Sequence, residues 1–240
     1  MPAKPPTDSW TLKTIAYIHN DFPTKFGLPR QSGMLEGCLS TIVFETAYRN
    51  ADALRGIEGY SHIWLIWGFS EMAREGFTPM VRPPRLGGNR RIGVFATRSP
   101  NRPNPLGLTC VKLESITHTQ QGTVLTVSGA DMMDGTPIYD IKPYLAYADA
   151  IPQATGGFTD ESDFEPLQVV FPEQWLSMIP QDRRATLFKV LQNDPRPAYQ
   201  HSAERVYGFF YAGLNVRFRV ADRVLTVWEI TPMDAAPPSP

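Results

Sequence analysis

The feature that most constrains the fold of this chain is a series of short apolar runs between positions 14 and 145, each bounded by turn residues. The runs are rich in β-branched and aromatic side chains, and the intervals between them are too short for regular crossover helices. Such spacing favours an antiparallel barrel or sandwich over a doubly wound α/β sheet. The runs read TIAYIHN, CLSTIVFE, SHIWLIWGFS, RIGVFAT, TCVKLESI, TVLTVSGA and PIYDIKPYL. We also expect one short helical turn, near residues 50–55.

The composition of the sequence changes after the last of these runs. The segment DAIPQATGGFTDESDFEP holds five acidic residues between Asp149 and Glu165 together with Gly and Pro, which is typical of a linker. Beyond it, EQWLSMI and PQDRRATLFKVLQND have helical patterns, with Pro180 suited to the first turn of the second helix. LNVRFRVADRVLTVWEI alternates apolar and polar residues around a turn at 221–223, which predicts a hairpin with one apolar face. We therefore expect a β-rich domain over 10–150, a linker over 151–170 and a small α+β domain over 171–232.

Composition and charge exclude several classes of protein. The 240 residues carry a formal net charge of −1, which argues against a generally basic nucleic-acid binder. No apolar run approaches the length of a transmembrane helix, and the segment MPAKPPTDSW contains no apolar core of a signal peptide. Cys38 and Cys110 lie far apart in strand-like surroundings, which favours reduced thiols over a disulfide. A cytoplasmic location fits these observations best.

The net charge conceals one long segment without any acidic residue, between Glu75 and Glu114. Its cations alternate with Pro and Gly instead of lying on a helix, which indicates ordered loops that contact phosphate groups. The alternative is a solvated surface of like charges. The cations are Arg82, Arg85, Arg90, Arg91, Arg98, Arg102 and Lys112.

Within that segment, FATRSPNRPNPLGL places three prolines in six residues, 100–105. Proline fixes φ and removes a backbone donor, so these residues form neither a helix nor a central strand. We expect a stiff, extended loop in which Arg98 and Arg102 are held in place. Such a loop is suited to meeting an anion; the alternative is a structural crossover whose arginines pair with nearby carboxylates.

Common catalytic and cofactor motifs are absent from the sequence. It contains no phosphate-binding P-loop, no GxGxxG after a strand and no GxSxG turn. The four histidines lack the spacing of metal ligands, so no metal site is predicted. A second dense stretch, DMMDGTPIYDIKPYLAYAD from Asp131 to Asp149, reads either as a hairpin with turn aspartates or as a site for a cationic small molecule.

Four motifs in one order carry a family resemblance: LPRQ (28–31), VRPPRLGGNRRIGVFATRSPNRPNPLGL (81–108), DMMDGTPIYDIKPYL (131–145) and DPRPAY (194–199). Together they resemble the TsaA-like, TrmO-type family over residues 15–229. Members of this family are S-adenosylmethionine-dependent tRNA methyltransferases. They methylate N6 of threonylcarbamoyladenosine, the modified adenosine next to the anticodon of threonine tRNA.

The resemblance implies a mainly β protein, with an N-terminal antiparallel β-barrel methyltransferase domain of a non-Rossmann kind and a small α+β C-terminal domain. It also implies a homodimer, threonylcarbamoylated tRNA as the partner, and a C-terminal domain that helps to hold tRNA. On that reading, truncation near residue 150 leaves a folded dimer that binds cofactor; if instead the C-terminal domain caps the barrel, truncation prevents folding. The implied cofactor contacts are Pro29, Arg30, Gln31, Phe69, Ser70, Arg98, Leu108, Asp131, Met132, Met133 and Asp134.

The chemistry of these residue types suits the implied cofactor. An arginine can pair with the carboxylate of S-adenosylmethionine, and carboxylates favour its sulfonium. Asp134, Asp140 and Tyr144 are equal candidates to accept the proton that the substrate loses, and water is a fourth. Two other readings stay open at this point: a methyltransferase of the same fold that acts on a small molecule, and a non-enzymatic RNA-binding module that uses Arg82 to Arg102.

Overall fold

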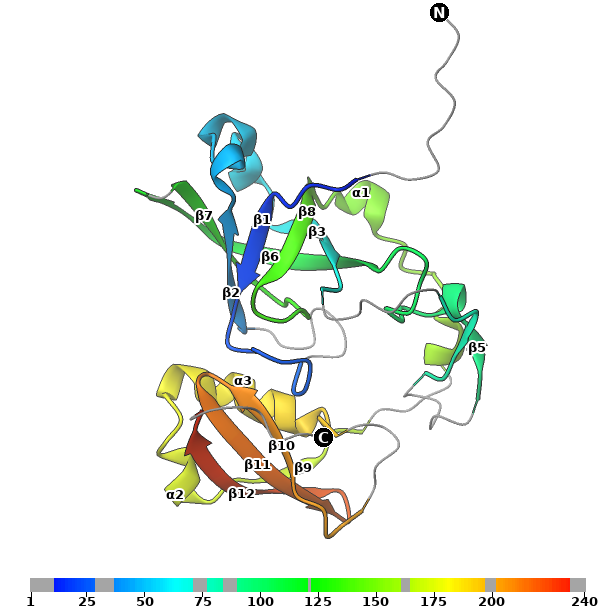
Figure 1. Cartoon of the computed structure of the whole chain (residues 1–240), viewed down its shortest axis with the longest axis vertical. Helices are drawn as coiled ribbons and strands as arrows, with labels where there is room; N and C mark the ends of the chain where they lie inside the picture. Colours follow the sequence, from blue (N-terminus) through cyan, green and yellow to red (C-terminus); the bar gives the residue numbers. More distant parts are fainter. Residues whose placement is uncertain are drawn as a thin grey trace, which may run out of the picture.

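The N-terminal half forms a closed barrel of six antiparallel strands (Figure 1). In this computed structural model, the described residues are 11–28, 37–70, 77–83, 90–120, 122–160, 165–196 and 202–233. Around the barrel the strands follow the order β1-β2-β7-β6-β3-β8, and pairing of β8 with β1 closes it. The barrel strands are β1 (Ala16–His19), β2 (Leu39–Phe44), β3 (His62–Gly68), β6 (Leu106–Thr119), β7 (Gly122–Ser128) and β8 (Thr136–Pro143).

Alternation of side chains along each strand builds the barrel core. In β3 the side chains of Ile63, Leu65 and Trp67 are buried, and the residues between them are half-buried. Ile42 from β2 and Leu125 from β7 complete the same core. Because side chains of a strand alternate between its two faces, the period of two in the sequence determines which residues enter the barrel. The predicted mainly β fold with a non-Rossmann barrel is confirmed.

One apolar run does not become a barrel strand. The segment RIGVFAT contributes only β5 (Ile92–Gly93), which pairs with β4 (Met80–Val81), and then turns into a 3₁₀ helix over Val94–Ala96. The helical turn expected near 50–55 is present as a 3₁₀ helix over Ala51–Leu54. Further 3₁₀ turns span Thr46–Tyr48, Ile57–Gly59 and Gly157–Thr159, and the short helix α1 spans Ala146–Asp149.

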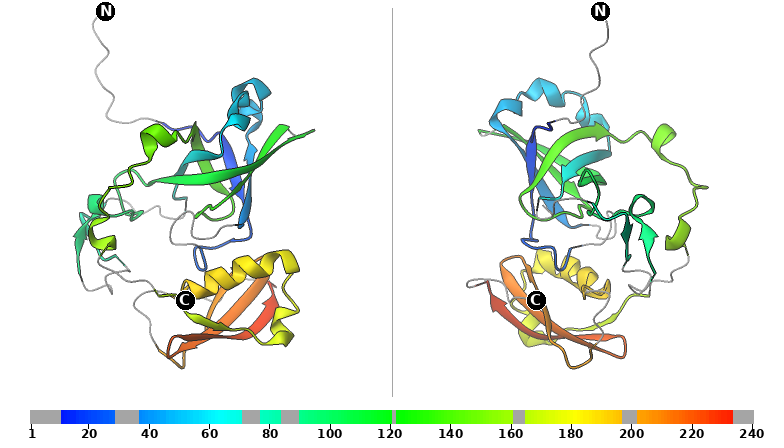
Figure 2. Two further views of the ribbon diagram at one scale, coloured as in Figure 1. Left: turned by 180° about the vertical axis from the view of Figure 1, so that it is seen from behind. Right: turned by 45° about the vertical axis from the view of Figure 1, so that its right-hand side comes forward.

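The C-terminal half is a four-stranded sheet in the order β10-β11-β12-β9, covered by helix α3 on the face turned toward the barrel (Figures 1 and 2). The predicted hairpin is the pair β11–β12, and Asp222 and Arg223 in its turn both have positive φ. Leu187 and Leu191 of α3 are fully buried in this second core. The elements are β9 (Gln168–Val170), α2 (Glu173–Leu176), α3 (Gln181–Gln192), β10 (Tyr207–Tyr211), β11 (Leu214–Ala221) and β12 (Val224–Pro232).

The two halves share side chains across their junction. The segment that follows β1 leaves the barrel and reaches the C-terminal half beside α3, as both views of Figure 2 show. Phe22 and Cys38 are 1% and 4% exposed, and both belong to the core of the C-terminal half. Leu167, inside the predicted linker, belongs to that core as well. The C-terminal half therefore begins by Leu167, and its core includes residues from the N-terminal part of the chain.

Two observations bear on the environment of the chain. Cys38 and Cys110 are free thiols. Within the described residues, no helix has both the length and the apolar character needed to cross a membrane.

Candidate cofactor site

The turn that joins β7 to β8, Asp131–Asp134, is tied closely to the end of β1. Asp134 N–H donates to the carbonyl of Phe22 at 2.8 Å, and its Oδ1 accepts from the backbone N–H of Asn20 at 3.1 Å. The amide of Asn20 donates to the carbonyl of Met132 at 2.8 Å. Gly135 has φ 73°, which agrees with the predicted Asp-Gly turn. Residues 18–22 and 131–135 thus form one hydrogen-bonded unit.

Histidine lies beside this turn as well. Nδ1 of His19 is 3.1 Å from Oδ1 of Asp134, and both side chains are close to half exposed. Met132, in contrast, is 1% exposed and packs inside the barrel, so its side chain belongs to the core. Met133 and Asp131 are half-buried. Asp131, Met133 and Asp134 are therefore more available to a ligand than Met132.

The end of strand β3 reaches the same turn through a buried relay. Trp67 Nε1–H donates to Oγ1 of Thr109 at 2.9 Å, and that hydroxyl donates to Oδ1 of Asp131 at 2.7 Å. The rings of Trp67 and Phe69 are 4.3 Å apart between centroids. The structure therefore brings Phe69 and Asp131 together through two residues, Trp67 and Thr109, that the motifs did not single out.

The proline loop is fastened from within by Arg102. Its Nη1 donates to the carbonyls of Thr97 at 2.8 Å and Ser99 at 3.3 Å. At its far end, the carbonyl of Pro105 accepts from the backbone N–H of Phe69 at 3.0 Å, which joins the loop to the end of β3. The expectation of a stiff loop that holds Arg102 is confirmed. Arg98 is exposed.

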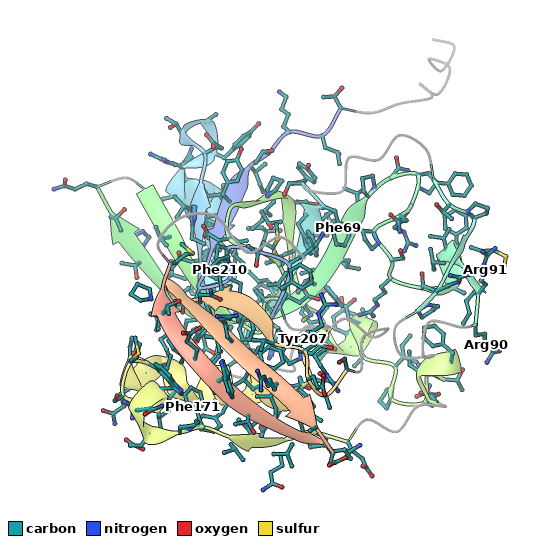
Figure 3. All side chains as sticks on the ribbon, turned by 60° about the horizontal axis from the view of Figure 1, so that its bottom comes forward. Phe69, Arg90, Arg91, Phe171, Tyr207 and Phe210 are labelled. Atoms are coloured by element: carbon teal, nitrogen blue, oxygen red, sulfur yellow. The ribbon has the colours of Figure 1, made fainter. Side chains whose placement is uncertain are left out.

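The other expected contacts differ in their surroundings. Leu108 lies on β6 and is 59% exposed, and Ser70 is exposed directly after Phe69. Pro29, Arg30 and Gln31 lie outside the described residues, as does Arg85. Figure 3 shows Arg90 and Arg91 at the outer edge of the region around β5, away from Phe69.

The three candidate proton acceptors occupy different places. Tyr144 N–H donates to the carbonyl of His62 at the start of β3. Along an extended strand, His62 lies about 23 Å from Phe69. Asp140 pairs with Lys142 at 2.8 Å on β8. Of the three, only Asp134 lies on the turn that also carries Asp131. Tyr139, which lies in the third motif but was not among the expected contacts, places its hydroxyl against Gly68, where an added Cβ would lie 2.4 Å away.

At the opposite end of β3 a carboxylate has a structural role. Asp149 Oδ2 accepts from Trp64 Nε1 at 3.0 Å and from the backbone N–H of Leu145 at 2.8 Å. These hydrogen bonds, first the one from Leu145, lower the pKa of the Asp149 carboxyl below its ordinary value. Asp149 therefore fastens α1 to the barrel and stands apart from the turn at 131–134.

Comparison with known proteins assigns the chain. Residues 17–150 match the tRNA-methyltransferase O N-terminal domain, and residues 164–233 match the TrmO C-terminal domain. The chain belongs to the tRNA-methyltransferase O family. The resemblance seen in the four motifs is confirmed, and with it the prediction of an S-adenosylmethionine-dependent tRNA methyltransferase.

Individual members of the tRNA-methyltransferase O family align along nearly the whole chain. The tRNA (adenine(37)-N6)-methyltransferase of Escherichia coli strain K12 is 37% identical over 232 residues, covering 93% of this chain and 99% of that protein. A relative from Pseudomonas aeruginosa whose name describes an S-adenosylmethionine-dependent methyltransferase is 38% identical, covering 87% of this chain and 91% of the relative. The crystal structure of TrmO from P. aeruginosa superposes with a TM-score of 0.75 at 29% identity, covering 95% of this chain and all of that one.

Proposed function

We propose that this protein transfers the methyl group of S-adenosylmethionine to N6 of adenosine 37 in tRNA, and that its substrate is threonylcarbamoyladenosine in threonine tRNA. The observation that carries the proposal is the match of both TrmO domains in order along the chain. The E. coli relative, whose name states methylation at N6 of adenine 37, supports the position on the tRNA. The four sequence motifs and the family they resemble support the modified base.

The side chains of the turn at 131–134, together with Phe69 and with Arg98 of the proline loop, suit the cofactor. Asp131 and Asp134 provide negative charge for a sulfonium, the exposed guanidinium of Arg98 suits a carboxylate, and Phe69 offers an aromatic face to adenine. When bound, S-adenosylmethionine supplies a methyl group that its sulfonium already activates. The protein's own contribution is then mainly alignment, which can lower a barrier by about 7–11 kcal/mol at most.

The nitrogen that accepts the methyl group must lose a proton, and we assign the acceptor role to Asp134. Its carboxylate lies on the same turn as Asp131, and His19 and the N–H of Asn20 fix its Oδ1 at 3.1 Å. Asp140 pairs with Lys142 on β8, and Tyr144, directly after β8, hydrogen-bonds to His62 at the start of β3. Asp134→Asn keeps the size of the side chain and removes the acceptor, so it lowers kcat at saturating S-adenosylmethionine; it also removes one of the two negative charges proposed to face the sulfonium and therefore raises the Kd for the cofactor.

Two further properties belong to the proposal. We propose a homodimer, in keeping with the family resemblance and with exposed apolar side chains around the cationic segment, such as Phe95 at 72% and Met80 at 47% exposed. We also propose that the protein works in the cytoplasm, where free thiols such as Cys38 and Cys110 persist.

Mass spectrometry of nucleosides tests the proposed function directly. tRNA with and without the threonylcarbamoyl group is incubated with the protein and isotope-labelled S-adenosylmethionine, then digested. We expect label only in N6-methylated threonylcarbamoyladenosine. Label in unmodified adenosine would contradict the proposed substrate. Cofactor binding without label in any tRNA would favour a small-molecule methyltransferase, and tRNA binding without cofactor binding would favour an RNA-binding module.

A further inference from the structure

The segment Asn20–Leu28 connects the turn at 131–134 with the C-terminal half. One side of it carries the hydrogen bonds to Met132 and Asp134 described above. Its other side faces α3 and the β10–β11 hairpin. A segment that contacts both partners provides a contiguous path along which a displacement of one can reach the other.

The contacts on the C-terminal side are polar and apolar together. Arg183 of α3 pairs through Nε with Oδ2 of Asp21 at 2.6 Å, and the two side chains are 37% and 26% exposed. The N–H of Ala212, in the β10–β11 turn, donates to the carbonyl of Asp21 at 3.0 Å. The ring of Phe22 packs on that of Tyr211, with centroids 5.2 Å apart, and the hydroxyl of Tyr211 donates to the carbonyl of Arg183 at 3.2 Å.

The same junction continues toward the LPRQ motif. Phe26 and Leu28 pack against the C-terminal core. Gly27 has φ 83° and lies so close to the ring of Phe209 that an added Cβ would be 2.3 Å from it. Leu28 is the first residue of LPRQ, so the chain enters that motif directly from the C-terminal core.

Burial at the junction is that of a domain interior. Phe22 is 1% exposed, whereas a contact between independently moving domains is more polar and leaves such a side chain at least partly in solvent. Burial is also the main cause that raises the pKa of the Asp21 carboxyl, although Arg183 opposes it. The ion pair therefore lies in a partly desolvated environment, where removal of one partner leaves the charge of the other uncompensated.

From these contacts we infer that the C-terminal half is a positioning element of the cofactor site: Arg183, acting through Asp21 and Phe22, holds the turn at 131–134 in place. This inference rests on the proposed function, because it takes that turn as part of the cofactor site. It gives the C-terminal half a task that is independent of tRNA. By reciprocity, a ligand that shifts α3 also changes cofactor affinity.

Calorimetry of S-adenosylmethionine with the full-length protein, in the absence of tRNA, tests the inference. Arg183→Ala and Asp21→Ala each raise the Kd by about five- to tenfold, and the double variant raises it no further than either single one. Arg183→Lys keeps the charge and recovers most of the affinity. The matched control is Arg223→Ala, which breaks another ion pair of the C-terminal half, 2.8 Å from Glu165, and leaves the Kd unchanged.

A loss of folding cannot be mistaken for the expected result. Thermal unfolding is measured for every variant, and if Arg183→Ala does not fold, Phe22→Leu decides the matter. Phe22→Leu keeps an apolar side chain but loses the ring contact with Tyr211, and it raises the Kd by about threefold. A folded Arg183→Ala or Phe22→Leu protein with wild-type affinity overturns the inference and leaves the proposed function intact. Wild-type protein that does not bind S-adenosylmethionine overturns both.

Discussion

Gly107, on strand β6, explains how the relay to Asp131 is assembled. A Cβ at this position would lie 2.1 Å from the indole ring of Trp67, so only glycine lets the ring lie across the strand. The indole N–H of Trp67 then donates to Oγ1 of Thr109, whose hydroxyl donates to Oδ1 of Asp131. Because Trp67 is 6% and Thr109 1% exposed, water cannot easily replace either partner. Gly107 therefore makes room for the hydrogen bonds from Trp67 to Thr109 and from Thr109 to Asp131, which orient the Asp131 carboxylate.

Replacing Thr109 by valine tests the relay. Thr109→Val keeps the volume of the side chain but leaves the N–H of Trp67 buried without a partner and removes a donor from Asp131. We expect a loss of about 1–3 kcal/mol in the free energy of unfolding and a weaker affinity for S-adenosylmethionine. Denaturant titration and calorimetry measure the two effects. Thr126→Val, on strand β7, is the control, and equal cofactor affinity in both variants would show that the relay has no part in binding.

At the scale of elements, the structure distinguishes two arginines of the proline loop, Arg98 and Arg102, that look alike in the sequence. Arg102 donates to carbonyls of its own loop, whereas Arg98 is exposed. We expect Arg98→Ala to weaken cofactor binding by about 1.5–3 kcal/mol, the effect of losing a charged hydrogen bond, while the protein still folds. Arg102→Ala instead loosens the loop and lowers the melting temperature. Calorimetry on folded Arg98→Ala that gives the wild-type Kd would remove Arg98 from the site.

The acid-free segment around β4 and β5 carries the second prediction at this scale. Arg91 is exposed at the outer edge of that region (Figure 3), where it is suited to a phosphate of tRNA. Arg91→Glu should reduce the slope of log affinity for tRNA against log salt concentration by about one unit, because one phosphate contact is lost. Arg55→Glu is the control, because Arg55 directly follows the 3₁₀ helix Ala51–Leu54 and lies outside the acid-free segment. Identical slopes for Arg91→Glu and wild type would show that Arg91 faces elsewhere.

Sequence patterns predicted those elements whose signal is local. Alternating side chains identified the barrel strands, and Ala221–Arg223 identified the turn of the β11–β12 hairpin. The segment RIGVFAT was wrong as a full strand: within the described residues, it pairs only through Ile92 and Gly93 with Met80 and Val81 of β4. The family resemblance named Phe69, Asp131 and Asp134 as expected contacts, yet it could not show Trp67 or Thr109, which connect Phe69 to Asp131 only through tertiary contacts.

At the scale of the whole molecule, the acidic linker suggested two separable domains, but their cores are interleaved. Phe22 and Cys38 lie far from the C-terminal half in sequence and are nevertheless buried in its core. No local pattern reveals such a contact, since an apolar residue in a loop looks the same whether it packs against its own domain or another. Through the segment that follows β1, the interleaving connects the turn at 131–134 to α3, and we expect the fold of that segment to depend on the C-terminal half.

Cys38 offers a direct measure of that dependence. Burial, together with the nearby Asp21, raises the pKa of its thiol to about 11, so at pH 8 roughly a thousandth of it is thiolate, against about a quarter of an ordinary exposed cysteine. In a Cys110→Ser background, we expect the full-length chain to react very slowly with a thiol reagent. A chain truncated after residue 160 loses the core around Phe22 and Cys38, so its thiol reacts at the rate of an exposed cysteine, and both its melting temperature and its cofactor affinity fall. A truncated protein with a protected Cys38 and full methylation of tRNA would contradict the dependence of the barrel on the C-terminal half.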